Sequence, residues 1–494
     1  MDMSVERSGQ QHFIKLFSYT TRYFWLLIIP VIRSLYSLSF SVDAFRIWLQ
    51  GTWLDLIVLG AILAFAWLRL ISVSFRFNDS RIIVKRGIIV TAEDIVNYSE
   101  ISTFSIKQNL IYKLFGAVKV YIATNAGIFD KADITLVMKR SDADKLYLSI
   151  KGARVKSLNY SISPNKLRLF IFSILSSSTL SGMLVALALI VETSRVFDRE
   201  VEARIILDTL SEYANRLAQI VPPLAAAASI IIAISWLISF ITNVFYFWDY
   251  VLTKCPDSIY IKSGLFAKNR HIISLKRVNY IDLKQNFLAK LLRISSLHCH
   301  CSGYGSTGRS ELSVVMPITT SGEIASTIGE VFPEYPHPKV QLKSSLASYG
   351  GFYFWPLVFA LLPLGVYLPV DYFFPEWHSV AVTAVMIGEI PSIWLAIAKT
   401  LALFTTGIGM TDGYLTMKYS KVYSFHTVIA PAEKITKVVI RQAPPQTINN
   451  TCTAIIYTAS DAKVRHRIYG LDIDKALKFF DNNGFDLYFS ENPE

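Results

Sequence analysis

An internal repeat runs through the 494 residues of this chain. Residues 75–124 and 252–301 align without a gap, and the alignment places Gly87 on Gly264. The most specific block is Lys-Gln-Asn followed by Lys-Leu, which occurs as Lys107-Gln108-Asn109 with Lys113-Leu114 and as Lys284-Gln285-Asn286 with Lys290-Leu291. Self-similarity over such a length indicates that one structural unit has been duplicated.

A weaker third copy lies near the C-terminus. It places Ile435 on Ile101 and Ile440 on Ile106, whereas Lys421 occupies the position of the repeat glycine. The chain therefore contains three related units, and the third is the most divergent.

Each copy has the pattern of a small β-structure that ends in a helix. Short runs of β-branched and aromatic residues stop at Gly87 and Gly264, where a glycine with positive φ lets the chain reverse into a second strand. Lys421 predicts a different turn in the third copy. Helical stretches close the copies at residues 142–150, 321–331 and 472–480. This order predicts a small capped barrel or a strongly bent sheet.

Long apolar runs separate these units. Apolar residues make up 52% of the chain and charged residues only 17%, and a membrane-spanning helix needs about 20 apolar residues. Runs of about this length cover residues 23–40, 53–73, 167–191, 224–247, 352–370 and 380–404. We therefore expect an α+β membrane protein with six transmembrane helices in three hairpins, which alternate with three small domains.

The expected organisation follows the chain in order. A cytoplasmic N-terminus (1–20) precedes a first hairpin (21–73) and domain (74–160), a second hairpin (165–247) and domain (248–334), and a third hairpin (350–404) and domain (405–494).

Charge predicts which side of the membrane the domains occupy. The formal net charge is +12, and lysine and arginine are sparse in the segments that join the two helices of each hairpin. The positive-inside rule then places both termini and all three domains in the cytoplasm. Four cysteines are too few for a disulfide framework and indicate reduced thiols.

The glycine hairpin followed by the Gln-Asn and Lys-Leu block resembles the bacterial pleckstrin-homology-like (PH) domain. Its repetition after membrane hairpins is similar to the YdbT-like membrane proteins. The resemblance implies a PH-like fold for each unit and a multi-pass protein of the bacterial inner membrane without enzymatic chemistry. It also implies a scaffold for protein partners or lipid headgroups, with a broader role in envelope maintenance or stress resistance.

The second copy is the most basic. Residues 251–301 contain nine lysines and arginines against Asp257 and Asp282, and basic residues near a bilayer attract anionic lipid. The candidate contacts with a headgroup or a protein partner are Lys268, Arg270, Lys276, Arg277 and Lys284. A topology signal with a solvated surface explains the same charges. No aromatic interleaving or recognition helix accompanies them, so nucleic acid is not an expected partner.

The run His298-Cys299-His300-Cys301 is the best candidate for metal chemistry. On a strand, alternate residues face opposite sides, so only the two histidines or only the two cysteines could meet one ion, and two ligands rarely suffice. An ordinary strand with buried sulfur and exposed imidazole explains the pattern better. We expect no metal site, no cofactor and no catalytic residue.

Charged residues within the apolar runs suggest an alternative function. Arg33 lies in the first run, and Glu389, Pro391 and Lys399 lie in the last. Ionisable groups inside membrane spans are often functional, and a proline-broken helix can line a transport site. A transporter or lipid-handling protein that uses Arg33 and Glu389 is therefore the alternative to a scaffold.

Overall fold

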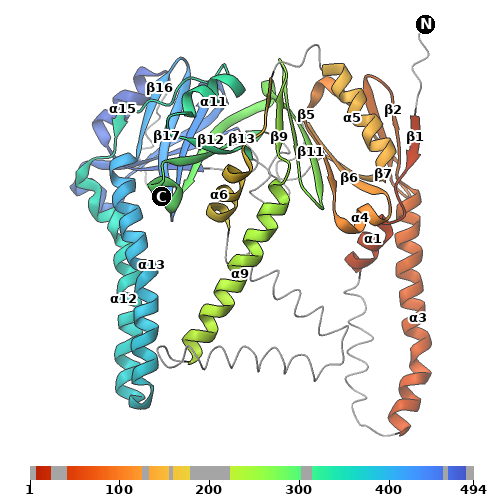
Figure 1. The fold of residues 1–494 in the computed structure, drawn as a ribbon, viewed down its shortest axis with the longest axis horizontal. Coiled ribbons are helices and arrows are strands. Elements are labelled where there is room, and N and C mark those ends of the chain that lie inside the picture. The colour runs from red at the N-terminus through yellow and green to blue at the C-terminus, as the bar shows by residue number, and fades with distance from the viewer. Residues whose placement is uncertain are drawn as a thin grey trace. The chain divides into compact units, whose positions relative to one another are not determined.

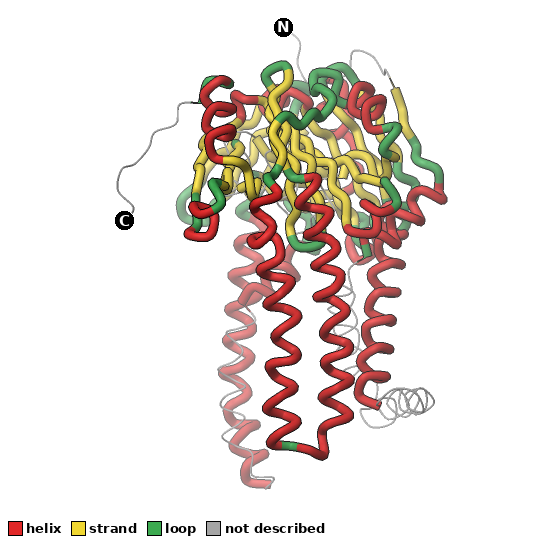
Figure 2. Tube along the Cα trace, turned by 90° about the vertical axis from the view of Figure 1, so that its left-hand side faces the viewer, coloured by secondary structure: helices red, strands yellow, loops and turns green. Residues whose placement is uncertain are grey.

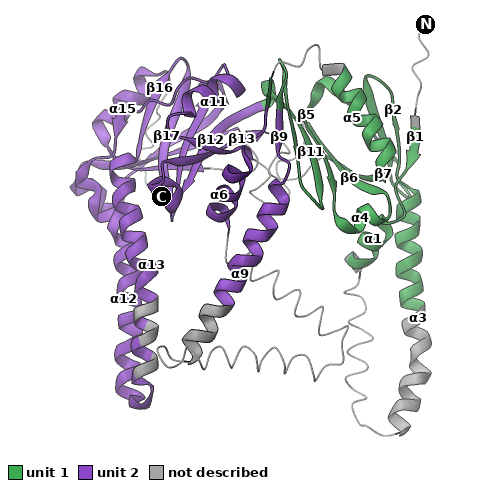
Figure 3. Cartoon of the chain, in the orientation of Figure 1, with its two compact units in different colours: residues 1–161, 253–277, 302–307 green, residues 162–252, 278–301, 308–494 purple. Residues whose placement is uncertain are grey.

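The computed structural model describes residues 7–23, 42–124, 133–154, 160–177, 223–301, 314–459 and 465–485. These residues fall into two compact units (Figure 3). The first comprises Met1–Ser161, Thr253–Arg277 and Ser302–Thr307, and the second comprises Ile162–Leu252, Val278–Cys301 and Gly308–Glu494. The boundary falls inside the second repeat, so its early and late strands belong to different units.

The first repeat supplies strands to two sheets of unit 1 and a closing helix (Figure 1). The first sheet has the order β1-β2-β3-β4, and the next three strands lead into α5. The elements are β1 (Arg7–Gln10), β2 (Ser74–Phe77), β3 (Arg81–Arg86), β4 (Ala92–Asn97), β5 (Ile101–Gln108), β6 (Ala117–Thr124), β7 (Ile134–Lys139) and α5 (Arg140–Arg154).

The strands β5, β6 and β7 do not form a sheet of their own. They continue into strands of the second repeat in a seven-stranded sheet of order β7-β6-β5-β11-β10-β9-β8. The added strands are β8 (Tyr160–Ile162), β9 (Val251–Lys254), β10 (Ser258–Ser263) and β11 (Lys268–Ser274). One buried core accordingly contains Phe104 and Leu136 of the first repeat together with Tyr260 and Ile272 of the second.

Unit 2 repeats this arrangement. Its seven-stranded sheet has the order β14-β13-β12-β18-β17-β16-β15, and a three-stranded sheet β19-β20-β21 follows. The elements are β12 (Val278–Asn286), β13 (Ile294–Cys301), β14 (Val314–Thr320), α11 (Ile324–Val331), β15 (Leu342–Lys343), β16 (Gly407–Thr411), β17 (Tyr414–Lys421), β18 (Ser424–Pro431), β19 (Ile435–Arg441), β20 (Thr451–Thr458), β21 (Arg465–Asp472) and α15 (Ile473–Asn482). The closing helices α5, α11 and α15 lie where the sequence predicts them.

The repeat turns have the backbone that glycine favours. Gly87 has φ +128° and Gly264 has φ +105°, and a Cβ atom at either position would lie 1.8 Å from a backbone oxygen, of Val90 or Ala267 respectively. In the third repeat, β17 and β18 are instead joined by only two residues, and Val422 has φ +53°. The divergent turn at Lys421 is therefore shorter.

The long helices extend away from the strands (Figure 2). The helices α12 (Tyr349–Phe373) and α13 (His378–Thr405) lie side by side in unit 2, where the Tyr353 hydroxyl is 2.6 Å from the Thr400 hydroxyl. The remaining helices of at least nine residues are α1 (Lys15–Tyr23), α3 (Val42–Ile71), α6 (Lys166–Ser176) and α9 (Pro223–Phe247).

The prediction of six transmembrane helices in three hairpins is wrong. Among the described residues, one helix, Leu346–Phe373, is long and apolar enough to cross a membrane. The apolar parts of α3 and α9, Ile57–Ile71 and Ile231–Phe247, are shorter than the roughly 20 residues that a span needs. Most of the predicted runs 23–40 and 167–191 lies outside the described residues. Counting apolar residues along the sequence therefore overestimated the number of spans.

Candidate functional site at the seams between repeats

The repeats are joined by two antiparallel strand pairs, which we call the first and second seams. In the first seam β5 pairs with β11, and Ile106 lies opposite Arg270. In the second seam β12 pairs with β18, and Leu283 lies opposite Thr427. Each seam thus extends a sheet of one repeat with strands of the next, so main-chain hydrogen bonds hold neighbouring repeats together.

Basic residues of the second repeat form ion pairs across the first seam. Arg270 Nη1 is 2.7 Å from Asp144 Oδ1, and its guanidinium lies 5.7 Å from the ring centre of Tyr147. Arg277 Nη2 is 2.8 Å from Glu100 Oε2. Both acids belong to the first repeat, so these two arginines contact a neighbouring repeat rather than only solvent.

The other predicted contact residues lie in different surroundings. Lys276 pairs with Asp257 of its own repeat at 3.1 Å. Lys268 is exposed at the start of β11, and Lys284 is half-buried on β12. The five residues therefore do not share one environment, and their contact with a headgroup or partner stays a prediction.

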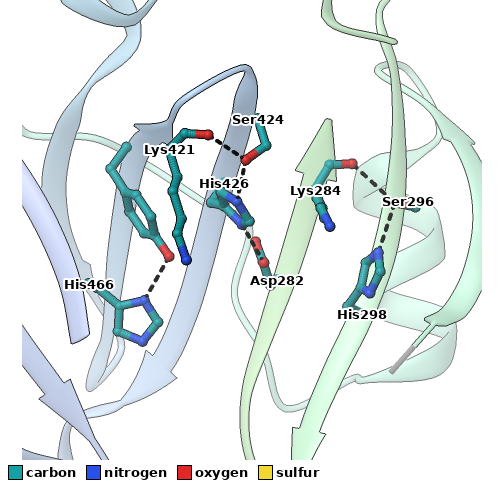
Figure 4. A network of polar contacts seen from close by, with 9 residues as sticks. Asp282, Lys284, Ser296, His298, Lys421, Ser424, His426 and His466 are labelled. Carbon is teal, nitrogen blue, oxygen red and sulfur yellow. Dashed lines mark hydrogen bonds and ion pairs between the residues drawn. The ribbon is translucent and has the colours of Figure 1, made fainter. Parts of the chain in front are cut away.

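A polar network crosses the second seam (Figure 4). His426 Nδ1 on β18 is 2.7 Å from Asp282 Oδ2 on β12, and His426 Nε2 is 3.0 Å from Ser424 Oγ. Asp282 is 6% exposed, so water does not screen this pair strongly. Sequence reasoning missed the contact because the two residues belong to different repeats.

The contacts run from Asp282 to His426 to Ser424, as in a hydrolytic triad. The serine hydroxyl, however, does not donate its proton to the histidine. Ser424 Oγ donates its proton to the Lys421 carbonyl at 2.8 Å, so it can only accept from His426 Nε2. A general base would need to accept the serine proton. The arrangement therefore suits a hydrogen-bonded contact that joins two strands.

Three further histidines surround this pair. His466 Nδ1 lies 2.9 Å from the Tyr419 hydroxyl, and its Nε2 lies 3.2 Å from Thr458 Oγ1. His298 Nε2 lies 2.9 Å from Ser296 Oγ, and His300 stacks on Tyr280 with ring centres 4.4 Å apart. Polar and aromatic contacts thus extend from β13 across both seam strands to β21.

Burial sets the charge states in the network. It lowers the pKa of His298 to about 3 and that of His466 to about 4. Burial alone would raise the pKa of Asp282, but the charge and hydrogen bond of His426 outweigh it and lower that pKa. The network therefore holds an ionised carboxylate next to neutral histidines.

The expectation of exposed imidazoles in the run from His298 to Cys301 is wrong, because His300 is half-buried rather than exposed. Cys299 and Cys301 are buried, as predicted, but His298 is buried as well. Its imidazole instead contacts Ser296 of the same strand, β13. Within the described ranges, no three histidine, cysteine or acidic side chains are placed to hold a metal ion.

Only one of the two predicted transport residues can be placed. Arg33 lies outside the described residues. Glu389 is half-buried on α13, and its Oε1 has no hydrogen-bond partner in the part of the chain that the structure describes.

The repeated strand order and closing helix define a protein built from three PH-like units. The bacterial PH domain family matches residues 26–154, 203–330 and 358–482, which is more than half of the chain. The chain therefore belongs to this family, which confirms the predicted resemblance.

A curated relative supports the same assignment. The chain is 18% identical over 378 residues to the UPF0699 transmembrane protein YdbT of Bacillus subtilis (strain 168), and the alignment covers 71% of this chain and 76% of that protein. No solved structure matches the chain. The relative and the apolar helix Leu346–Phe373 together support membrane localisation.

Proposed function

We propose that this protein is a non-enzymatic, membrane-anchored scaffold that presents three PH domains in the cytoplasm to a protein partner or to anionic lipid headgroups. The observation that carries the proposal is the pair of seven-stranded sheets. Because each sheet belongs to two repeats, the PH domains are mechanically coupled and can offer a continuous surface. The connection between α12 and α13 contains no lysine or arginine, which supports a cytoplasmic orientation of the domains at the inner membrane.

Ion pairs within the chain reduce the number of basic residues that are available to bind an external anion. Arg270, Lys276 and Arg277 already face acidic side chains. Lys268 is exposed and has no ion-pair partner among the described residues. It is therefore the predicted residue best placed to meet an external anion.

A photo-crosslinking amino acid at position 268 of the full-length protein, irradiated in cells, tests this proposal. We expect a crosslink to one defined protein or to an acidic phospholipid, and the mass of the product distinguishes the two. Lys475, exposed on α15, provides the control position. Crosslinking at 268 that is no stronger or more specific than at 475 would contradict a binding surface there.

Transport remains the second candidate because one oxygen of the Glu389 carboxyl, on a long helix, has no partner among the residues that the structure describes. The change Glu389→Gln keeps the shape of the side chain and removes its charge. Loss of solute or lipid flux in proteoliposomes would favour transport. Unchanged flux, or no flux from the unmodified protein, would contradict transport and favour the scaffold function.

A further inference from the structure

Two of the edge strands in the part of the chain that the structure describes, β4 and β19, are considered together because they hold equivalent positions in their repeats. The strand β4 is the last of the first sheet, and β19 is the first of the last sheet. No residue of either strand is buried. In contrast, the seam strand β5 is buried at seven of its eight residues.

The repeat shows what these two edges correspond to. A short 3-10 turn follows β4, β11 and β18 in turn, at Tyr98–Glu100, Leu275–Arg277 and Ala432–Lys434, and leads directly into β5, β12 and β19. Each seam joins the strand after this turn to the strand before the same turn in the next repeat. In the third repeat the strand after the turn, β19, lacks such a neighbour, and in the first repeat the strand before the turn, β4, lacks one.

We propose that β19 of one copy of this chain pairs with β4 of a second copy, as a third seam between molecules. The contact is head-to-tail, so it builds a closed ring or an open chain of copies. Unpaired edge strands readily add a strand from another chain. This inference does not depend on what the PH domains bind.

The two internal seams also predict the register of the third. Ile106 opposite Arg270 and Leu283 opposite Thr427 are equivalent pairs. When each residue of these pairs is replaced by its equivalent in the third and the first repeat, Ile440 lies opposite Glu93. Val438 then lies opposite Ile95. The side chain of Ile95 is 56% exposed, so this pairing would cover an apolar residue that the isolated chain leaves in water.

The two edges have opposite charges. The strand β4 carries Glu93 and Asp94, whereas β19 carries Lys437 and Arg441 and no acid. In the inferred register Asp94 lies diagonally between the two basic residues on one face of the sheet. Glu93 and Asp94 also form exposed ion pairs with Lys85 and Arg86 on β3, which does not remove their attraction for a basic strand.

The ion pair of the first seam has a counterpart as well. Arg277 meets Glu100 at the end of that seam. The equivalent positions in the inferred contact are Glu100 of one copy and Lys434 of the other. The first seam and the inferred contact therefore both have opposite charges at this position, but the acid and the base exchange strands.

Crosslinking between two differently tagged full-length copies in membranes tests the proposal. One copy carries Ile95→Cys and the other carries Val438→Cys, and a short thiol-to-thiol reagent joins side chains that lie opposite each other. The native cysteines are all buried. We expect a mixed dimer that contains both tags. The control replaces Val438→Cys by Lys437→Cys, whose side chain points to the other face, and should lose most of this product.

The absence of a mixed dimer above this control would overturn the inference. A chain with both cysteines that only crosslinks internally would also overturn it, because β4 would then pair with its own β19. A crosslink to a different protein would assign the edge to that partner instead. Reversing Asp94→Lys should lower the mixed dimer about two- to five-fold, and Lys437→Glu with Arg441→Glu in the other copy should restore it; failure of this rescue would exclude the inferred register.

Discussion

Individual histidines make both seams sensitive to acid. His271 on β11 lies 2.8 Å from Ser105 on β5, and burial lowers its pKa to about 3. His298 on β13 and His466 on β21, which lie near the second seam, are held neutral in the same way. In the unfolded chain each would have a pKa near 6.5. A seam that buries neutral histidines is therefore most stable when the pH is above this value.

Acidification should weaken the seams in a defined range. The pKa of these histidines is lower in the folded state than in the unfolded state, so their contribution is complete above about pH 6.5 and is lost as the pH falls toward 4. Each such histidine lowers the free energy of unfolding by at most about 1.4 kcal/mol for each pH unit in this range. Thermal unfolding of the purified protein between pH 7 and 4 measures the slope.

A histidine substitution identifies the source of this slope. His298→Asn should make the dependence on pH shallower, whereas His337→Asn, at an exposed position, should leave it unchanged. Equal slopes in all three proteins would show that the buried histidines are not responsible.

The ion-pair and hydrogen-bond partners of individual residues are the least predictable feature. The sequence identified Arg270 and Arg277 as members of a basic cluster, because the acids near them in sequence are few. Their partners Asp144 and Glu100 lie more than a hundred residues away. His426 was unassigned for the same reason, since Asp282 belongs to another repeat. Local charge counts contain no information on such partners.

At the scale of elements, the repeat turns provide a direct test. Replacing Gly87 or Gly264 by valine places a Cβ atom against a backbone oxygen and imposes an unfavourable φ. We expect a loss of at least about 1 kcal/mol in stability. Protease resistance and expression of the full-length variants report this loss.

A third glycine serves as the control for these variants. Gly152 is exposed on α5, and a Cβ atom there meets nothing within 4 Å. Gly152→Val should therefore be neutral or slightly stabilising. If the turn variants behave like it, positive φ at the turns is not required.

The strands and closing helices follow from sequence, but their partners do not. Alternation and the glycine turns predict strands before and after Gly87 and Gly264, and these are present as β3, β4, β10 and β11. A period of two only states which face is apolar. The alternation within β5 would be the same whether its outer neighbour were a strand of its own repeat or β11 of the next repeat. The sequence therefore predicted three separate small domains, whereas the structure joins them.

At the scale of the whole molecule, the seams distinguish a coupled array from three independent domains. The membership in the bacterial PH domain family and the threefold repeat were predictable because they depend on local motifs. The number of membrane spans was not, because apolar runs do not report where a continuous helix begins and ends. Coupling between repeats is the central claim, and it resides in the backbone hydrogen bonds of four strands.

Hydrogen exchange of the intact protein in lipid nanodiscs measures those bonds directly. The account predicts that amides of β5, β11, β12 and β18 that face the seams are protected as strongly as those of the interior strands β6 and β20, because all of them lie within continuous sheets. Fast exchange of the seam strands, at the rate of the exposed turn that follows Gly87, with β6 and β20 still protected, would contradict it.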